Sequence, residues 1–104
     1  MKYIFFIISL ALFFTACAVS GKFQPEEKNL VIMQQRVPAV TIEELKEGFS
    51  IYKTNCSSCH RLHAPAEFDQ GKWEKELNEM LPKAKITDPA VQKKLKDYLY
   101  AMAK

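Results

Sequence analysis

Apolar side chains recur with the period of an α-helix in three segments of the chain after residue 40. The first segment runs from about Ile42 to Lys53. Thr41, directly before it, starts a capping-box pattern that Glu44 completes. One face of this segment holds its apolar residues, which are Ile42, Leu45, Phe49 and Tyr52. The sequence therefore predicts an amphipathic helix that begins directly after Thr41.

Two more helices are predicted nearer the C-terminus. The first is limited by Pro82, because a helix interior does not tolerate proline. Its apolar face consists of Trp73, Leu77, Met80 and Leu81. The second has Asp88 as its cap and Pro89 in the first helical position. Its apolar face consists of Val91, Leu95, Tyr98, Leu99 and Met102.

The N-terminal segment 1–16 has the pattern of a signal peptide. Lys2 precedes a nearly all-apolar run, and small residues stand directly before Cys17. The run is too short to span a membrane comfortably, which takes about 20 apolar residues. A cysteine at this place resembles a bacterial lipoprotein signal, so we expect cleavage, a lipid on Cys17 and a membrane-anchored lipoprotein on the periplasmic side. The alternatives are an uncleaved short anchor, or ordinary cleavage nearby that leaves a thiol at position 17.

Residues 17–40 show no sustained period and contain Gly21, Pro25 and Pro38. We predict that this segment is a tether between the membrane and a domain of residues 41–104. A short apolar stretch, 30–33, could pack on the domain as an extended arm, and the sequence leaves that open.

Length, composition and charge narrow the class of protein. The chain has 104 residues, enough for one domain, and no stretch alternates like a strand, so we predict an all-α fold with about three helices and a loop from Arg61 to Gly71. The net charge is +3, but Lys2 is expected to leave with the signal peptide. Basic and acidic residues are also interleaved, without a basic stripe. We therefore predict no nucleic-acid partner.

The segment from Cys56 to His60 reads Cys-Ser-Ser-Cys-His, the C-x-x-C-H pattern of haem attachment. Two cysteines at this spacing, Cys56 and Cys59, can form thioethers with the two vinyl groups, and the adjacent His60 is then delivered to the iron. A thioredoxin-like dithiol would need a neighbouring βαβ pattern. A zinc site would need a second ligand pair, whereas the chain offers only His63 and Cys17. We predict one covalent haem (heme c), which would also staple a domain too short for a large core.

On these residues, the segment 41–104 resembles a minimal class I c-type cytochrome. In that family a glycine lets the first and last helices cross closely against an aromatic residue, and Gly48 is the match here. The resemblance implies a cytochrome c-like fold, packed around the haem. In similar small cytochromes a proline carbonyl accepts the second ring N–H of the axial histidine, which implies Pro65. The alternative is that Pro65 only shapes the loop.

The sixth ligand of the iron has few candidates. His63 is too close to His60 to reach the opposite face of the ring. Of the methionines, Met33 lies in the tether and Met102 at the end of the last helix. The family places its methionine between the attachment motif and the last helix, so the resemblance implies Met80, with Trp73 near the haem. A role for Met80 in packing alone is the alternative.

A haem with histidine and methionine ligands has no open position for a substrate. We therefore expect an electron carrier with redox protein partners, not an enzyme. The alternatives are a haem-based sensor or gas-binding protein with an open sixth site, and a structural subunit of a larger respiratory complex. Four lysines could form a basic docking rim, or only a solvated face with the glutamates between them. They are Lys72, Lys75, Lys83 and Lys85.

Overall fold

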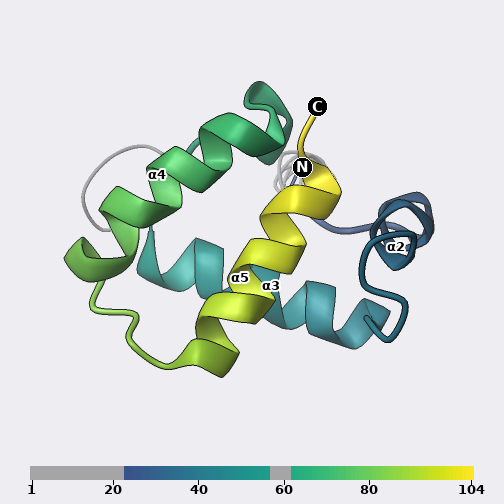
Figure 1. Ribbon diagram of the computed structural model, residues 1–104, viewed down its shortest axis with the longest axis horizontal. Coiled ribbons are helices and arrows are strands. Elements are labelled where there is room, and N and C mark those ends of the chain that lie inside the picture. The colour runs from purple at the N-terminus through teal and green to yellow at the C-terminus, as the bar shows by residue number, and fades with distance from the viewer. Residues whose placement is uncertain (1–22, 57–61) are drawn as a thin grey trace, which may run out of the picture.

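A computed structural model describes residues 23–56 and 62–104 of the chain (Figure 1). In these two ranges the chain is all-α and contains no strand. The helices are α2 (Glu27–Gln34), α3 (Ile42–Asn55), α4 (Gln70–Lys83) and α5 (Pro89–Met102). A short 3₁₀ turn, η2 (Pro65–Glu67), lies in the loop before α4.

The predicted helix starts are confirmed, because the capping side chains make their bonds. Thr41 Oγ1 accepts a hydrogen bond from the Glu44 amide at 3.2 Å, and Asp88 Oδ1 accepts one from the Ala90 amide at 2.8 Å. The cap of α4 was not predicted from the sequence. There Asp69 Oδ1 accepts from the Lys72 amide at 2.8 Å. At the other end, α4 continues one residue past Pro82.

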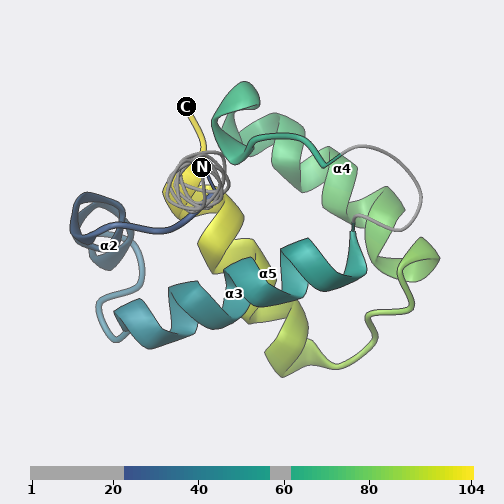
Figure 2. The ribbon, with the colours of Figure 1, turned by 180° about the vertical axis from the view of Figure 1, so that it is seen from behind.

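The centre of the molecule is the crossing of α3 and α5, which Figures 1 and 2 show from opposite sides. Gly48 lies at the crossing, as predicted. A Cβ atom at this position would be 2.2 Å from the Lys94 carbonyl oxygen and 2.6 Å from the Tyr98 Cβ. Real Cβ atoms do not come this close, so only glycine allows the observed helix spacing.

The helices α2 and α4 flank this crossed pair on opposite sides (Figure 1). The larger of two apolar clusters lies between α3, α4 and α5 and includes Tyr52, Trp73 and Tyr98. Its other buried members are Cys56, Leu77, Leu81, Ile86, Leu95 and Leu99. The apolar faces predicted for α4 and α5 thus meet Phe49 and Tyr52, the second half of the predicted α3 face, in this core.

The segment before Thr41 differs from the predicted tether, because residues 27–34 form a fourth helix that packs on the domain. Leu30 and Met33, one turn apart, are buried in a second cluster with Val40, Leu45 and Ala101. The buried Asn29 adds a hydrogen bond from its Nδ2 to the Ala101 carbonyl at 3.3 Å. Residues 23–40 therefore belong to the folded body.

We predict that Gly48→Ala destabilises the protein by roughly 1–3 kcal/mol, because the new methyl group forces α3 and α5 apart. That cost exceeds the gain in helix propensity, which is about 1 kcal/mol for a glycine-to-alanine change. Urea denaturation followed by circular dichroism measures the difference.

Gly71→Ala is the matched control for this prediction. A Cβ at Gly71 would meet only the Asp69 Oδ1, at 3.5 Å, which is an ordinary contact. This variant should be as stable as the wild type or more so. Equal stability of the Gly48→Ala variant and the wild type would contradict the packing argument.

Candidate functional site

The haem-attachment motif begins where α3 ends. Cys56 follows the last residue of α3, and its amide donates to the Tyr52 carbonyl at 3.1 Å. The Cys56 side chain is 5 % exposed and belongs to the main apolar cluster. Cys59 and His60 lie outside the described residues, as does Cys17. The described part of the motif is therefore the cysteine that α3 directs into the core.

The backbones of α3 and α4 stay apart although both helices contribute to the main cluster. No Cα atom of α3 lies within 8 Å of a Cα atom of α4. Large side chains bridge part of this distance, since the rings of Tyr52 and Trp73 meet edge to face with their centroids 5.8 Å apart. A cavity occupies another part of the space between α3 and α4.

This cavity has a volume of about 230 Å³ and brings Cys56 and Met80 to one space. The other lining residues come from the end of α3 and the second half of α4 and its cap: Asn55, Glu76, Glu79, Lys83 and Ala84. Met80 is half-buried and packs against the main cluster. It lies two turns after Trp73, so one face of α4 carries both residues.

The other candidates for the sixth ligand are placed elsewhere. Met33 is buried in the second cluster, under α2, and Met102 packs near the end of α5. Neither lines the cavity next to Cys56. His63 Nδ1 lies 3.0 Å from Glu67 Oε2, and its ring packs against Phe68. Of the candidates on described residues, Met80 is the one that shares a space with Cys56.

Pro65 and Trp73, both predicted near the haem, are brought into direct contact. The Trp73 Nε1 donates a buried hydrogen bond to the Pro65 carbonyl at 2.8 Å. Nearby, the Tyr52 hydroxyl donates to the His63 carbonyl at 2.5 Å. This bond was not predicted from the sequence, where the helical period places Tyr52 on an apolar face. The hydroxyl of Tyr52 could have indicated such a bond, because a buried tyrosine normally needs a hydrogen-bond partner.

The donor set of the cavity fits a covalent c-type haem. Cys56 sulfur, which the motif assigns to a thioether, and the Met80 thioether, a common axial ligand, face the same space between two helices. Within residues 23–56 and 62–104, no three His, Cys, Asp or Glu side chains cluster so as to hold a metal ion. In the same ranges, no helix has the length and apolar character needed to cross a bilayer.

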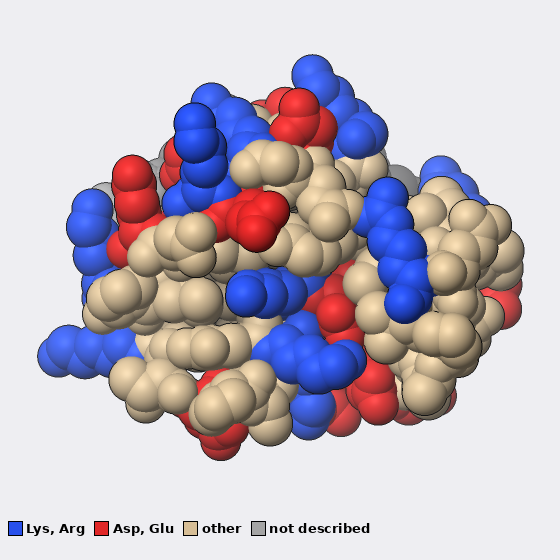
Figure 3. All heavy atoms as spheres, in the orientation of Figure 1, with Lys and Arg blue, Asp and Glu red and all other residues tan. Residues whose placement is uncertain are grey.

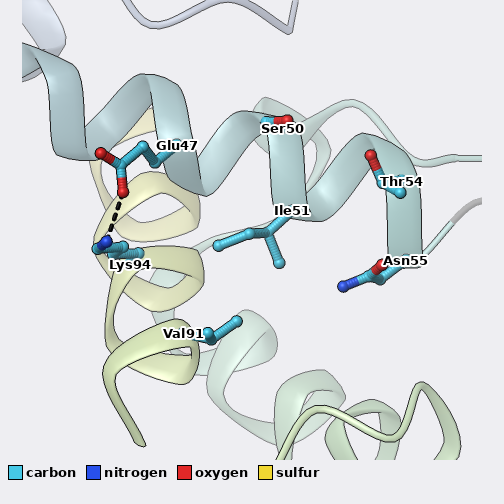
Figure 4. Close-up of a pocket in the computed structure, with 7 residues that line it drawn as sticks. All are labelled: Glu47, Ser50, Ile51, Thr54, Asn55, Val91 and Lys94. Carbon is cyan, nitrogen blue, oxygen red and sulfur yellow. Dashed lines mark ion pairs between the residues drawn. The ribbon is translucent and has the colours of Figure 1, made fainter. Parts of the chain in front are cut away.

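A shallower groove of about 430 Å³ lies along α3 and α5 (Figure 4). Ile51 and Val91 extend toward one another across it, and the ion pair of Glu47 and Lys94 closes one end. It contains neither Cys56 nor Met80. It is a surface groove between the crossed helices and not part of the candidate site.

The surface over α4 carries both signs of charge. Figure 3 shows lysine and glutamate side chains alternating there. Lys72 and Lys75 line a shallow hollow together with Glu76 and Glu79, and the Lys72 Nζ lies 4.8 Å from the centroid of the Phe68 ring. Of the four predicted rim lysines, Lys72 and Lys75 therefore lie beside Glu76 and Glu79, and Lys83 lines the cavity of Met80 together with the same two glutamates.

Comparison with known proteins gives no relative from which a function could be transferred. No protein-family model, curated protein or solved structure matches the chain.

Proposed function

We propose that the protein is a membrane-anchored electron carrier of the periplasmic side, with one haem attached through Cys56 and Cys59 and ligated by His60 and Met80. The observation that carries the proposal is the shared cavity of Cys56 and Met80 between two helices whose backbones stay apart. A covalent haem, when bound, supplies a one-electron couple between ferric and ferrous iron.

The arrangement of the helices supports a cytochrome c-like fold for this domain. Gly48 allows α3 and α5 to cross against Tyr98, which is the contact that the resemblance implied. One turn after Gly48 comes Tyr52, and one turn after Tyr52 comes Cys56. The same helix thus makes the crossing and delivers the first cysteine of the motif.

The role of Met80 supports electron transfer over substrate chemistry. With His60 and Met80 both holding the iron, a ligand such as oxygen would find no open position there. A thioether ligand also favours the reduced iron and raises the reduction potential. Met80 packs against the main cluster, on the helix face that also carries the buried residues Trp73 and Leu77.

The first prediction is that the haem stays on the chain when the protein is denatured and extracted with acid acetone, because thioether bonds survive both treatments. The pink colour should remain with the protein pellet. Cys17→Ser changes the cysteine outside the motif, so the Cys17→Ser protein that is exported should retain the colour equally well. Colour in the solvent would show that no thioether holds the haem.

The second prediction is that Met80→Ala removes the sixth ligand and leaves an open coordination position at the haem iron. The reduced variant should bind carbon monoxide readily, and the oxidised variant should lose the weak far-red band that sulfur-to-iron ligation gives. Visible absorption spectra measure both. If the native protein lacks this band and binds carbon monoxide untreated, the open-site sensor is the better reading.

Two methionine variants serve as controls for the Met80→Ala experiment. Met33→Ala should cost about 2–5 kcal/mol, because this side chain is 3 % exposed in the second cluster. Met102→Ala, at a partly buried position, should cost roughly 2 kcal/mol or less. Both should keep the far-red band. Loss of the band in Met102→Ala but not in Met80→Ala would show that the ligand is Met102.

The third prediction concerns the membrane anchor. Mass spectrometry of the mature protein should find a lipid-modified Cys17 at its amino terminus. Cys17→Ser should release the protein from membranes or block its maturation, because no residue remains to carry the lipid. A mature protein that still begins with Met1 would contradict this assignment.

A further inference from the structure

The outward face of α2 carries a pair of apolar side chains in contact with water. Val31 is 53 % exposed and Ile32 is 49 % exposed, whereas Leu30 and Met33 of the same helix are buried against the domain. Among the residues that the structure describes, Val31 and Ile32 are the two large apolar side chains that are exposed. Single apolar side chains on a surface are ordinary, but two neighbours on one helical turn form a small patch.

This patch lies close to the point at which the N-terminal segment enters the fold. The Tyr98 hydroxyl holds the carbonyl of Phe23, and residues 24–26 lead from there to the first residue of α2. The chain between Cys17 and Phe23 spans at most about 20 Å. A lipid on Cys17 would therefore keep α2 near the surface of the bilayer that holds this lipid.

The charge of this segment does not oppose its approach to a bilayer. Between positions 26 and 36, two acidic residues, Glu26 and Glu27, are balanced by two basic ones, Lys28 and Arg36. Lys28 Nζ also lies 3.5 Å from Glu26 Oε2. Since the segment is neutral, contact with lipid would come from the burial of apolar surface and not from attraction to anionic headgroups.

The size of the patch favours a lipid surface over a second copy of the chain. A specific protein interface buries about 800 Å² on each partner. Val31 and Ile32 offer far less, because they are two side chains of which about half is exposed. A bilayer that already holds the protein needs a smaller patch, because the short tether keeps the effective concentration of lipid high.

We propose that Val31 and Ile32 rest in the interfacial region of the bilayer that carries the Cys17 lipid, and that this contact orients the domain. This inference rests on the membrane anchor of the proposed function. α2 would lie along the membrane surface, with Leu30 and Met33 still facing the domain.

This orientation would turn the cavity of Cys56 and Met80 away from the lipid. α2 packs on Leu45, in the first turn of α3, whereas the cavity begins at Asn55, about 15 Å further along the same helix. Figure 1 shows α2 and the second half of α4 at opposite ends of the horizontal axis of the view. Redox partners would therefore reach the candidate site from the side that faces the compartment.

The test places a polarity-sensitive fluorescent label at single positions of the full-length, lipidated holoprotein in phosphatidylcholine vesicles. Ile32→Cys puts the label in the patch, and Asn78→Cys is the matched control on the exposed surface of α4. In the proposed holoprotein the native cysteines carry the lipid and the haem, so the introduced thiol is labelled selectively. The wild type, treated with the same reagent, gives the background.

Lipids that carry a quencher should quench the label at position 32 strongly and the label at position 78 weakly. The ratio of intensities with and without the quencher cancels any quenching by the haem. We also expect a blue-shifted emission at position 32 alone. Raised salt should leave the quenching at position 32 unchanged, because the contact is apolar.

A second experiment replaces the apolar pair and leaves the lipid on Cys17. The double variant Val31→Ser, Ile32→Ser carries the label at Lys28→Cys, one turn before Ile32 on the same face. Quenching at position 28 should be weaker in this variant than in the protein with the native pair. Thermal unfolding checks that the domain stays folded.

The possible outcomes separate this inference from the proposed function. Equal quenching at positions 32 and 78, or unchanged quenching at position 28 in the double variant, would refute the orientation and leave the anchor intact. A label at position 32 that is shielded from aqueous iodide but not quenched by the lipid would assign the patch to a protein, such as a second copy. A mature protein without a lipid on Cys17 would refute the anchor and this inference together.

Discussion

The contact between α3 and α5 at Gly48 is the constraint on which the rest of the structure depends. Because the Lys94 carbonyl and the Tyr98 Cβ occupy the space where a side chain would stand, the two helices can lie this close only with glycine at position 48. Tyr52, one turn further along α3, then lies with its ring centroid 6.0 Å from that of Tyr98. Cys56 follows after one more turn. The crossing thus fixes the depth at which the first cysteine of the motif enters the core.

The same crossing leaves α4 without a backbone contact to α3. α4 packs against α5, and only long side chains such as Trp73 reach α3. A domain of this size buries a smaller fraction of its surface on folding than a larger domain does, and each missing helix contact leaves the remaining core closer to the limit of stability. A large apolar group held between Cys56 and Met80 would add the missing contact. The proposed cofactor would therefore also have a structural role in this fold.

The sequence was sufficient for the features that depend on local chemistry. The capping residues Thr41 and Asp88 predicted two helix starts correctly, since such bonds form within three residues. The helix α2 was missed because apolar residues occur on both of its faces: Leu30 and Met33 are buried, whereas Val31 and Ile32 are about half exposed. A two-turn helix of this kind has no clear period, and contacts with Ala101, far along the chain, decide its structure.

Separation along the chain also explains why two hydrogen bonds of the candidate site could not be predicted from the sequence. The indole N–H of Trp73 and the hydroxyl of Tyr52 find carbonyls 8 and 11 residues away, and no sequence pattern specifies such pairs. Periodicity places a side chain on a face, but it does not say which backbone group that side chain meets. The sequence thus predicted Pro65 and Trp73 as neighbours of the haem, and only the structure shows that they bond to each other.

The packing of α2 changes what the proposed lipid anchor implies. With residues 23–40 in the folded body, the chain that separates Cys17 from Phe23 spans at most about 20 Å even when fully extended. Phe23 itself is held by the Tyr98 hydroxyl, at its backbone carbonyl. A lipidated carrier with so short a link stays close to the bilayer surface and cannot cross a wide compartment. Its electron donor and acceptor would then have to present their redox centres near the same membrane, so diffusion within that plane would bring the partners together.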